Sequence, residues 1–323
     1  MNQQLVDRIR QCPNLPALPG IAVQVLDMAQ RAEVGIAEIA QIISRDPALS
    51  GKILRTVNSS FYARGQPIGT VSHAVTILGL QSVKTLVLGF SLVSNIASTK
   101  DKGFKPLTCW KRGVYAATAA RVLGARLDVV QQEELFVATL LGDIGMLVLE
   151  RVLGDEYGDL CARYDTHPAL VEAELEKYRT THAEVGGLLA EDWKLPPVLQ
   201  IPIRHHHSPD AVSDETVRRL TELVDVAGRC ADVFLDARAD PALEAVRRML
   251  GQHQVPGPEC DLLLGEIGRK TREVATLFEI NVGLPEDFET ILKRANEALV
   301  DKPAPAAAAP AAPTTPSPTS TAA

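Results

Sequence analysis

Apolar residues recur at helical spacing along most of the chain. Ile36, Ile39, Ala40 and Ile43 fall at positions i, i+3, i+4 and i+7, so they share one stripe of a helix. No segment shows the sustained alternation of apolar and polar residues that marks a half-exposed strand. The pattern therefore predicts an almost entirely α-helical fold.

Several of the predicted helices begin or end at residues with a clear physical role. Asp46 can accept backbone N–H groups at a helix start, and Pro47 follows at the first helical position, where a missing N–H costs nothing. Thr70 is a second N-cap, and Gly79 ends the helix that Thr70 begins. Longer helices are predicted at residues 110–127, 132–153, 168–178, 182–193, 197–206, 215–236, 241–250, 259–278 and 285–299.

Composition narrows the class of protein. A chain of 323 residues that is 46% hydrophobic can bury a core, and a net charge of -7 argues against a protein that coats DNA. The longest apolar run is too short to span a bilayer, and the N-terminus lacks a secretory signal pattern. We therefore expect a soluble, cytoplasmic protein with no membrane or direct nucleic-acid partner. Free thiols in a reducing compartment are expected for Cys12, Cys109, Cys161, Cys230 and Cys260.

Three polar sites are embedded among apolar helix positions: residues 140–145, 181–186 and 204–209. Asp143 lies in a run that should be buried, and a buried carboxylate needs a cation, a metal or several donors. His182 stands at a helix start. We therefore favour its interpretation as a capping or surface residue over the alternative of an inward-facing ligand. For the run from His205 to His207 we likewise favour a solvated helix end, and a metal-binding tract is the alternative.

The order of these segments resembles the HDOD family, bacterial signalling modules related to the HD superfamily of metal-dependent phosphohydrolases. The similarity covers about Leu15 to Asp236. It rests on LPALPGIAVQVLDMA, the DPAL turn at 46–49 with KILRTVNSSFYA after it, PIGTVSHAVTILGL, Trp110, LLGDIGMLVL, THAEVGGLLAEDWKLP and IRHHHSP. The resemblance implies an N-terminal helical subdomain at residues 1–100, where a polar break follows, and an HD-like helical subdomain at 101–236. Additional helices at 237–301 and a disordered Pro/Ala-rich tail at 302–323 complete the chain.

The sequence departs from the metal-binding pattern that the resemblance implies. Catalytic HD relatives use a histidine, a His-Asp doublet, further histidines and a late aspartate to hold one or two metal ions. Here Gly142 occupies the position of the doublet's histidine. Arg112 stands near the position of the first histidine, and Gly228 occupies the position of the late aspartate. Asp225, one turn earlier, is a candidate substitute for it. Because glycine offers no ligand atom and a guanidinium stays protonated, we expect no bound metal or cofactor and no phosphohydrolase activity.

The donors that survive are Asp143, His182, His206 and His207, of which Asp143, His182 and His206 are weak metal-ligand candidates. We expect Arg112 to form a salt bridge with Asp143 in place of a metal. The alternative is an anion pocket formed by Arg112, His182 and His206 for a phosphate-bearing ligand. We favour the ion pair, because structural ion-pair networks are common at such sites.

The function implied by the resemblance is that of a non-catalytic regulatory module in signal transduction, which binds signalling proteins as partners. Two alternatives stay open: a residual metal-dependent phosphohydrolase acting on nucleotides, and a sensor that binds a nucleotide or phosphate without turnover. A separate cluster lies at residues 58–64 and includes Phe61, Tyr62 and Arg64. We favour its interpretation as a helix end folded back on its own core, and a surface for a protein partner is the alternative.

Overall fold

The computed structural model describes residues 3–13, 15, 18–29, 35–62, 65–97, 106–282 and 288–300. Within these residues the regular structure is entirely helical, which confirms the predicted fold class. The predicted tail and the polar break at 100–103 lie outside the described residues. No single helix in the described part is long and apolar enough to cross a membrane. The helices at residues 71–78 and 80–94 together have the required length and apolar composition, but they are bent by 114° relative to each other.

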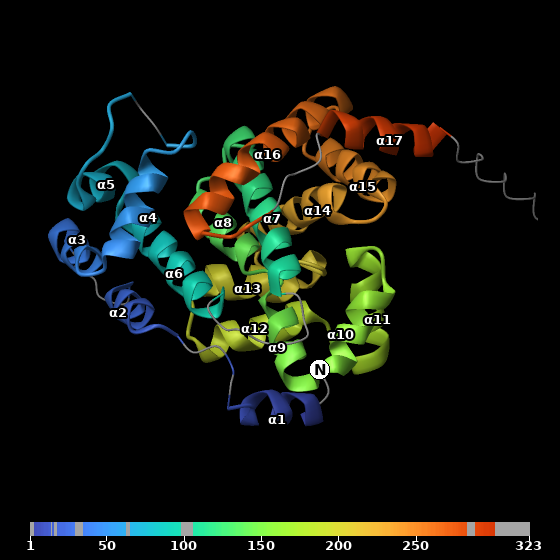
Figure 1. Ribbon diagram of the computed structural model, residues 1–323, viewed down its shortest axis with the longest axis horizontal. Helices are drawn as coiled ribbons and strands as arrows, with labels where there is room; N and C mark the ends of the chain where they lie inside the picture. Colours follow the sequence, from blue (N-terminus) through green and yellow to red (C-terminus); the bar gives the residue numbers. More distant parts are fainter. Residues whose placement is uncertain are drawn as a thin grey trace, which may run out of the picture.

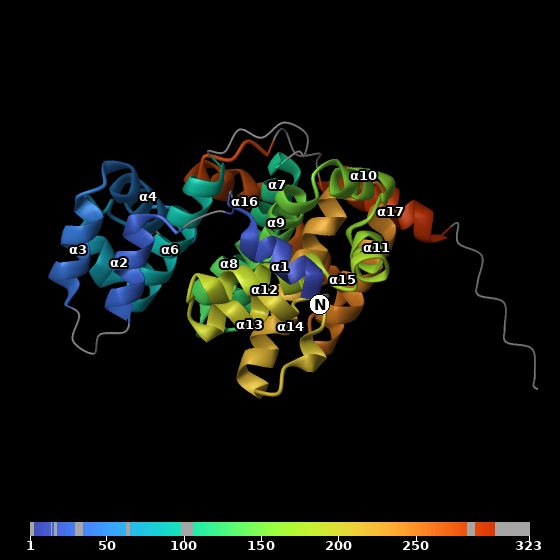
Figure 2. The same cartoon turned by 90° about the horizontal axis from the view of Figure 1, so that it is seen from below.

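One lobe of the molecule is built from helices of the N-terminal third, drawn in blue to teal at the left of Figures 1 and 2. Its helices are α2 (Gly20–Ala29), α3 (Ile36–Ser44), α4 (Pro47–Val57), α5 (Val71–Leu78) and α6 (Leu80–Ala97). The predicted caps are present: Asp46 accepts the backbone N–H of Leu49 at 3.0 Å, and Thr70 accepts that of His73 at 3.3 Å. Gly79 ends α5 with a φ of 86°, a backbone conformation that glycine adopts without strain.

The second lobe surrounds the long helix α7 (Pro106–Arg126), which packs against α8 and α14. The helix α1 (Gln3–Gln11) belongs with this lobe and not with the other N-terminal helices, because Arg8 donates to the carbonyl of Val152 at 2.7 Å (Figure 2). The remaining helices of this lobe are α8 (Gln132–Leu140), α9 (Ile144–Leu153), α10 (Asp155–Arg163), α11 (His167–Tyr178), α12 (His182–Asp192), α13 (Pro197–His205), the 3-10 helix η1 (Pro209–Ala211) and α14 (Glu215–Leu235).

The C-terminal helices α15 (Ala239–Gln252), α16 (Gly257–Phe278) and α17 (Phe288–Val300) follow α14. The helix α16 connects the two lobes, since it packs against α7 on one side and against α4 and α6 on the other (Figure 1). Its last residue, Phe278, packs against Phe90 of α6 and Phe136 of α8 with tilted rings, whose centroids lie 4.7 and 5.9 Å away. The lobes therefore share one continuous apolar core.

The cluster at residues 58–62 folds back on this core, as the favoured interpretation holds. Tyr62 donates to Glu133 at 2.5 Å, and Glu133 accepts two bonds from Arg121 at 2.6 and 2.8 Å. Arg121 also lies over the Tyr62 ring, and Ser60 bonds Glu273 of α16. Arg64 lies outside the described residues.

Two helix predictions are corrected by the structure. The single helix predicted at 132–153 is two helices, α8 and α9, separated by a turn at residues 141–143. Two backbone hydrogen bonds that each span three residues close the turn: the N–H of Gly142 donates to the carbonyl of Thr139, and that of Ile144 to the carbonyl of Leu141. Asp143 is the N-cap of α9. The helix α10 lies where none was predicted. The first difference places Asp143 at a helix start, and the second places Asp155, Asp159 and Cys161 in the lining of a cavity.

Gly145 allows α9 and α12 to approach closely enough to bring Asp143 and His182 together. A Cβ at this position would overlap the carbonyl oxygen of His182 and lie 2.6 Å from the backbone nitrogen of Gly186. Backbone atoms cannot move aside as a flexible side chain can. The two helices would therefore have to separate.

We predict that Gly145→Ala destabilises the protein by about 3 kcal/mol, measured by urea unfolding, because it overpacks two helix backbones. The matched control is Gly158→Ala in α10, where an added Cβ meets nothing within 4 Å. That variant should be as stable as the wild type or more stable by up to about 1 kcal/mol, because alanine favours a helix. Equal stability of the two variants would contradict this account of the α9–α12 contact.

Candidate functional site

Asp143 is buried and is held by Arg112 of α7. The Arg112 Nη1 atom lies 2.5 Å from Oδ2 of Asp143, so the expected ion pair is present. The rest of the guanidinium is also used: Nε donates to Asp232 at 2.9 Å, and Nη2 donates to the carbonyl of Gly228 at 3.2 Å. Arg112 thus joins α7, α9 and α14 through two carboxylates and a carbonyl.

Glycine at position 228 leaves room for this arginine. A Cβ there would lie 3.1 Å from Nη2 of Arg112, closer than ordinary van der Waals contact. Asp225, the candidate substitute for the late aspartate, pairs with Arg229 at 3.4 Å. The carboxylate that bonds Arg112 is Asp232, one turn after Gly228, which the sequence reasoning missed. Asp225 is not among the residues whose donor atoms gather beside Asp143 in the described part of the chain, so its candidacy for the late aspartate is not supported.

His182 is fully buried, so its interpretation as a surface residue is wrong. It occupies the first position of α12, after Thr181, whose side chain and that of Glu184 form a capping box. Both the backbone N and the Nδ1 of His182 lie 2.8 Å from Oε2 of Glu174, a carboxylate with no exposed surface. Tyr157 donates to the other oxygen of Glu174 at 2.5 Å. This chain of bonds fixes the ring and directs Nε2 of His182 toward Asp143, at 3.3 Å from Oδ1.

Two histidines at the end of α13 also face this point, so the run from His205 to His207 is not a solvated helix end. His206 is 2% exposed; its Nδ1 lies 2.9 Å from the carbonyl oxygen of Ile203, and its Nε2 lies 3.6 Å from Oδ1 of Asp143. His207 places Nε2 3.1 Å from Nε2 of His182. His205 is the neighbour that does not take part in these contacts.

The structure adds a fourth imidazole that the sequence reasoning missed. His167 is buried at the first position of α11, with Nε2 3.4 Å from Nε2 of His207 and 3.8 Å from Oδ1 of Asp143. The signal in the sequence was a threonine N-cap followed by histidine and proline, Thr166-His167-Pro168, which repeats the Thr181-His182 pattern. Gly142, in contrast, contributes only backbone beside His206.

Burial and charge act against each other in this site. Burial alone would raise the pKa of Asp143, but the Arg112 guanidinium holds it well below its usual range. Burial lowers the pKa of His167 and His207 well below the ordinary histidine value, with Arg112 adding to the effect. For His182, burial is outweighed by Glu174 and Asp143, which raise its pKa to about 9. The site therefore attracts positive charge at the position between Asp143 and His182.

The residues fit a divalent metal ion on one side of Asp143 only. Asp143, His167, His182 and His207 each offer one ligand atom, and these four atoms lie within 4.8 Å of one another. On the other side of Asp143 the guanidinium of Arg112 takes the place of any ion, and Gly142 and Gly228 supply no side-chain donor there. The described residues therefore offer no donor set for a second ion on the Arg112 side of Asp143.

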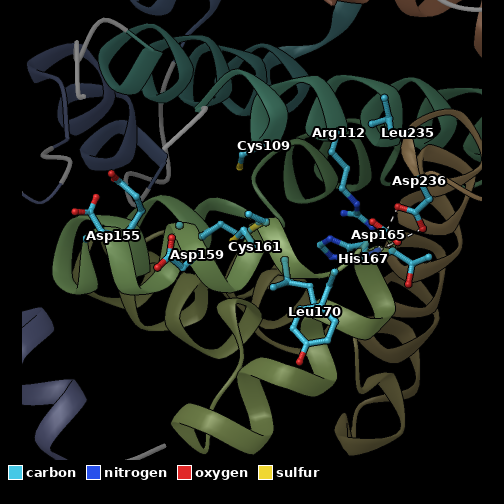
Figure 3. A pocket seen from close by; sticks show the side chains of 17 residues that line it. Cys109, Arg112, Asp155, Asp159, Cys161, Asp165, His167, Leu170, Leu235 and Asp236 are labelled. Carbon is cyan, nitrogen blue, oxygen red and sulfur yellow. Dashed lines mark hydrogen bonds between the residues drawn. The ribbon is translucent and has the colours of Figure 1, made fainter. Parts of the chain in front are cut away.

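A cavity of about 550 Å³ adjoins this cluster. Arg112, His167 and Asp236 lie together at one end of it, and Asp155 and Asp159 lie toward the other (Figure 3). The remaining lining includes the further carboxylates Glu150 and Asp165, the thiols of Cys109 and Cys161, and apolar side chains. Carboxylates thus outnumber the single arginine, whose charge is already neutralised by Asp143 and Asp232.

Comparison with known proteins identifies the family. A family model described as the HDOD domain matches residues 15–209, which is more than half of the chain. The chain therefore belongs to the HDOD family, and the resemblance seen in its sequence motifs is confirmed. An uncharacterized protein of Treponema pallidum (strain Nichols) is 25% identical over 209 residues, a match that covers 63% of this chain. The match covers 39% of the relative, so the chain corresponds to about two-fifths of that protein.

Solved structures share the fold over nearly their full length. An HDOD domain protein of unknown function from Geobacter sulfurreducens superposes with a TM-score of 0.64 at 22% identity, covering 87% of this chain and 99% of its own. A protein from Shewanella amazonensis SB2B, provisionally described as a phosphohydrolase, gives a TM-score of 0.61 at 25% identity, covering 85% and 97%. The coverage extends past the HDOD match, so the likeness includes more than residues 15–209.

We predict that Arg112→Met lowers the free energy of unfolding by about 3–5 kcal/mol, because it leaves two buried carboxylates without their cation. Arg112→Lys should cost less, since an ammonium group keeps the charge but cannot bond Asp143 and Asp232 with the same fork. The matched control is Arg204→Lys, whose pair with Glu191 is partly exposed and should contribute at most about 1 kcal/mol. Urea unfolding of the three variants measures this; a loss for Arg112→Met no larger than for the control would contradict it.

Proposed function

We propose that this HDOD protein is a non-catalytic regulatory module of signal transduction, which acts by contact with other signalling proteins. The single observation that carries the proposal is the Arg112 network. A protonated arginine bonded to Asp143, Asp232 and Gly228 stands among the positions where the related enzymes place metal ligands. A guanidinium has no lone pair for a metal and cannot activate a water molecule.

Hydrolysis is the competing function, because the Shewanella amazonensis neighbour carries the provisional description of a phosphohydrolase. Two-ion phosphohydrolases stabilise the attacking and the leaving oxygen with separate ions. Here the fit on the imidazole side uses four protein donors for one ion, and a site closed by four protein ligands keeps no position for water or substrate. When bound, such an ion would neutralise Asp143 and order the surrounding helices.

The electrostatics of the cavity also favour a non-catalytic role. Its wall carries Glu150, Asp155, Asp159, Asp165 and Asp236. A phosphate-bearing ligand would meet these carboxylates before it reached Arg112, and would find the guanidinium already bonded to two carboxylates. This arrangement argues against both a nucleotide hydrolase and the anion pocket of Arg112, His182 and His206. Regulation through protein contacts requires neither hydrolysis nor a bound phosphate.

The test is a hydrolysis assay on the untagged protein. We predict that the chain, incubated with zinc, manganese or ferrous iron, hydrolyses bis-p-nitrophenyl phosphate no faster than the same metal in buffer. The assay should include an active HD phosphohydrolase as positive control, so that a negative result is informative. Metal-dependent turnover by the wild type that disappears in Asp143→Asn would contradict the proposal, since Asp143 would then hold a catalytic ion.

A further inference from the structure

Four side-chain donor atoms from four separate helix ends converge beside Asp143. We propose that Asp143, His167, His182 and His207 form a closed site for a single zinc-like divalent ion, with the Arg112 guanidinium in place of a second cation. The adjacent distances around the cluster are 3.3 Å (Asp143 Oδ1 to His182 Nε2), 3.1 Å (His182 Nε2 to His207 Nε2), 3.4 Å (His207 Nε2 to His167 Nε2) and 3.8 Å (His167 Nε2 to Asp143 Oδ1). The sequence-based expectation of no bound metal missed His167 and is revised by this inference.

The hydrogen bonds on the outer side of two rings determine where their lone pairs point. The Nδ1 of His182 faces a carboxylate oxygen of Glu174, and the Nδ1 of His206 faces the carbonyl oxygen of Ile203; both oxygens can only accept. Each Nδ1 therefore carries a proton, and in the neutral ring each Nε2 presents a lone pair. Both lone pairs point toward Oδ1 of Asp143, at 3.3 and 3.6 Å.

Acceptors that face one another at this distance require a positive charge between them. Asp143 Oδ1, one of the four ligand atoms, is buried and has no hydrogen-bond partner among the described residues. An additional proton on His182 would satisfy one acceptor pair, whereas the cluster brings four ligand atoms within 4.8 Å of one another. A metal ion bonds all four atoms at once. The number of converging acceptors therefore favours a metal ion over a proton.

The spacing and the donor types indicate which kind of ion fits. Around zinc, bonds of about 2.0–2.1 Å to four tetrahedral ligands set the ligand atoms about 3.4 Å apart. Four of the six distances between the ligand atoms, 3.1–3.8 Å, bracket that value, and all six lie within 4.8 Å. Three imidazoles and one carboxylate are the ligands that zinc and neighbouring transition metals prefer, whereas calcium and magnesium prefer oxygen ligands.

Asp143 has a distinct partner for each of its two oxygens. Arg112 bonds Oδ2 at 2.5 Å, which leaves Oδ1 directed at the imidazoles. Arg112 is thus a positioning residue for the ion site. Glu174 is another, because it orients the ring of His182 through Nδ1, as a carboxylate commonly does for a metal-bound histidine. The ion would join the start of α9, the start of α11, the start of α12 and the end of α13. This inference deepens the proposed function, because a closed site stabilises a scaffold and has no position for a substrate.

The experiment uses the full, untagged chain stripped of metal by a chelator. Titration with zinc, followed by calorimetry and by elemental analysis after gel filtration, should give one ion per chain. Substitution with cobalt(II) should give the intense visible absorption of a four-coordinate ion. Adding inorganic phosphate should leave that spectrum unchanged, because a closed site offers no position for it.

Variants distinguish the ligands from their neighbours. His167→Gln and His207→Gln should each weaken zinc binding by about 100-fold or more, and Glu174→Gln by about 10–100-fold, the usual range for an outer partner. The matched control is His205→Gln, which removes an imidazole from the same run but outside the cluster, and should leave the affinity unchanged. His206→Gln should also retain stoichiometric zinc, because the four ligand atoms do not include His206.

The outcomes separate this inference from the proposed function. No zinc or cobalt bound by the folded wild type, shown by unchanged calorimetry, overturns the metal site and leaves the non-catalytic proposal intact. Equal affinity of His167→Gln, His205→Gln and wild type also overturns it. A cobalt spectrum that shifts with phosphate overturns the closed coordination. These readings do not depend on enzymatic activity, and the wild-type titration does not depend on whether a variant folds.

Discussion

The buried carboxylate of Asp143 is the constraint on which the rest of the site depends. An ionised carboxylate inside a helical core is strongly unfavourable unless positive charge and hydrogen bonds surround it. Arg112 supplies that charge on one side, and converging imidazoles surround the other oxygen. The close contact of α9 with α12 at Gly145 and the turn before α9 serve the same end, since they bring Asp143 to this point. The placement of the helix ends around Asp143 therefore serves to neutralise this carboxylate.

Arg112 fits this site because the residues around it give it room and acceptors. Its guanidinium is larger than an ion and has a fixed fork of donors, so it requires space and planar acceptors. Gly228 provides the space, and Asp232 and the carbonyl of Gly228 provide acceptors beside Asp143. A second carboxylate in the core would be destabilising by itself, but Asp232 bonds the same arginine and also lies 3.8 Å from Nη1 of Arg229. A guanidinium at this place thus depends on at least three positions on two helices: Arg112 of α7, and Gly228 and Asp232 of α14.

Much of the fold could be predicted from the sequence because its signals are local. The helical class and the caps at Asp46 and Thr70 depend on neighbouring residues, and the structure shows both. Asp143 could be recognised as a buried charge that needs a partner, and Arg112 as that partner through the family resemblance. Glu174, His167 and Asp232 could not be found in this way, because their contacts join separate helices: Arg112 and Asp232 are 120 positions apart. Burial of His182 was misjudged for the same reason, since a helix start is buried only when another helix covers it.

A double-mutant cycle between Arg112 and Asp143 tests the central claim most directly. Urea unfolding of the wild type, Arg112→Met, Asp143→Asn and the double variant gives the coupling energy of the pair without assigning the cost of either change alone. If the guanidinium is the cation that makes the buried carboxylate tolerable, the double variant should be less destabilised than the sum of the single variants by about 2–3 kcal/mol. Additive effects within about 0.5 kcal/mol would show that Asp143 is held by other groups, and would contradict the account.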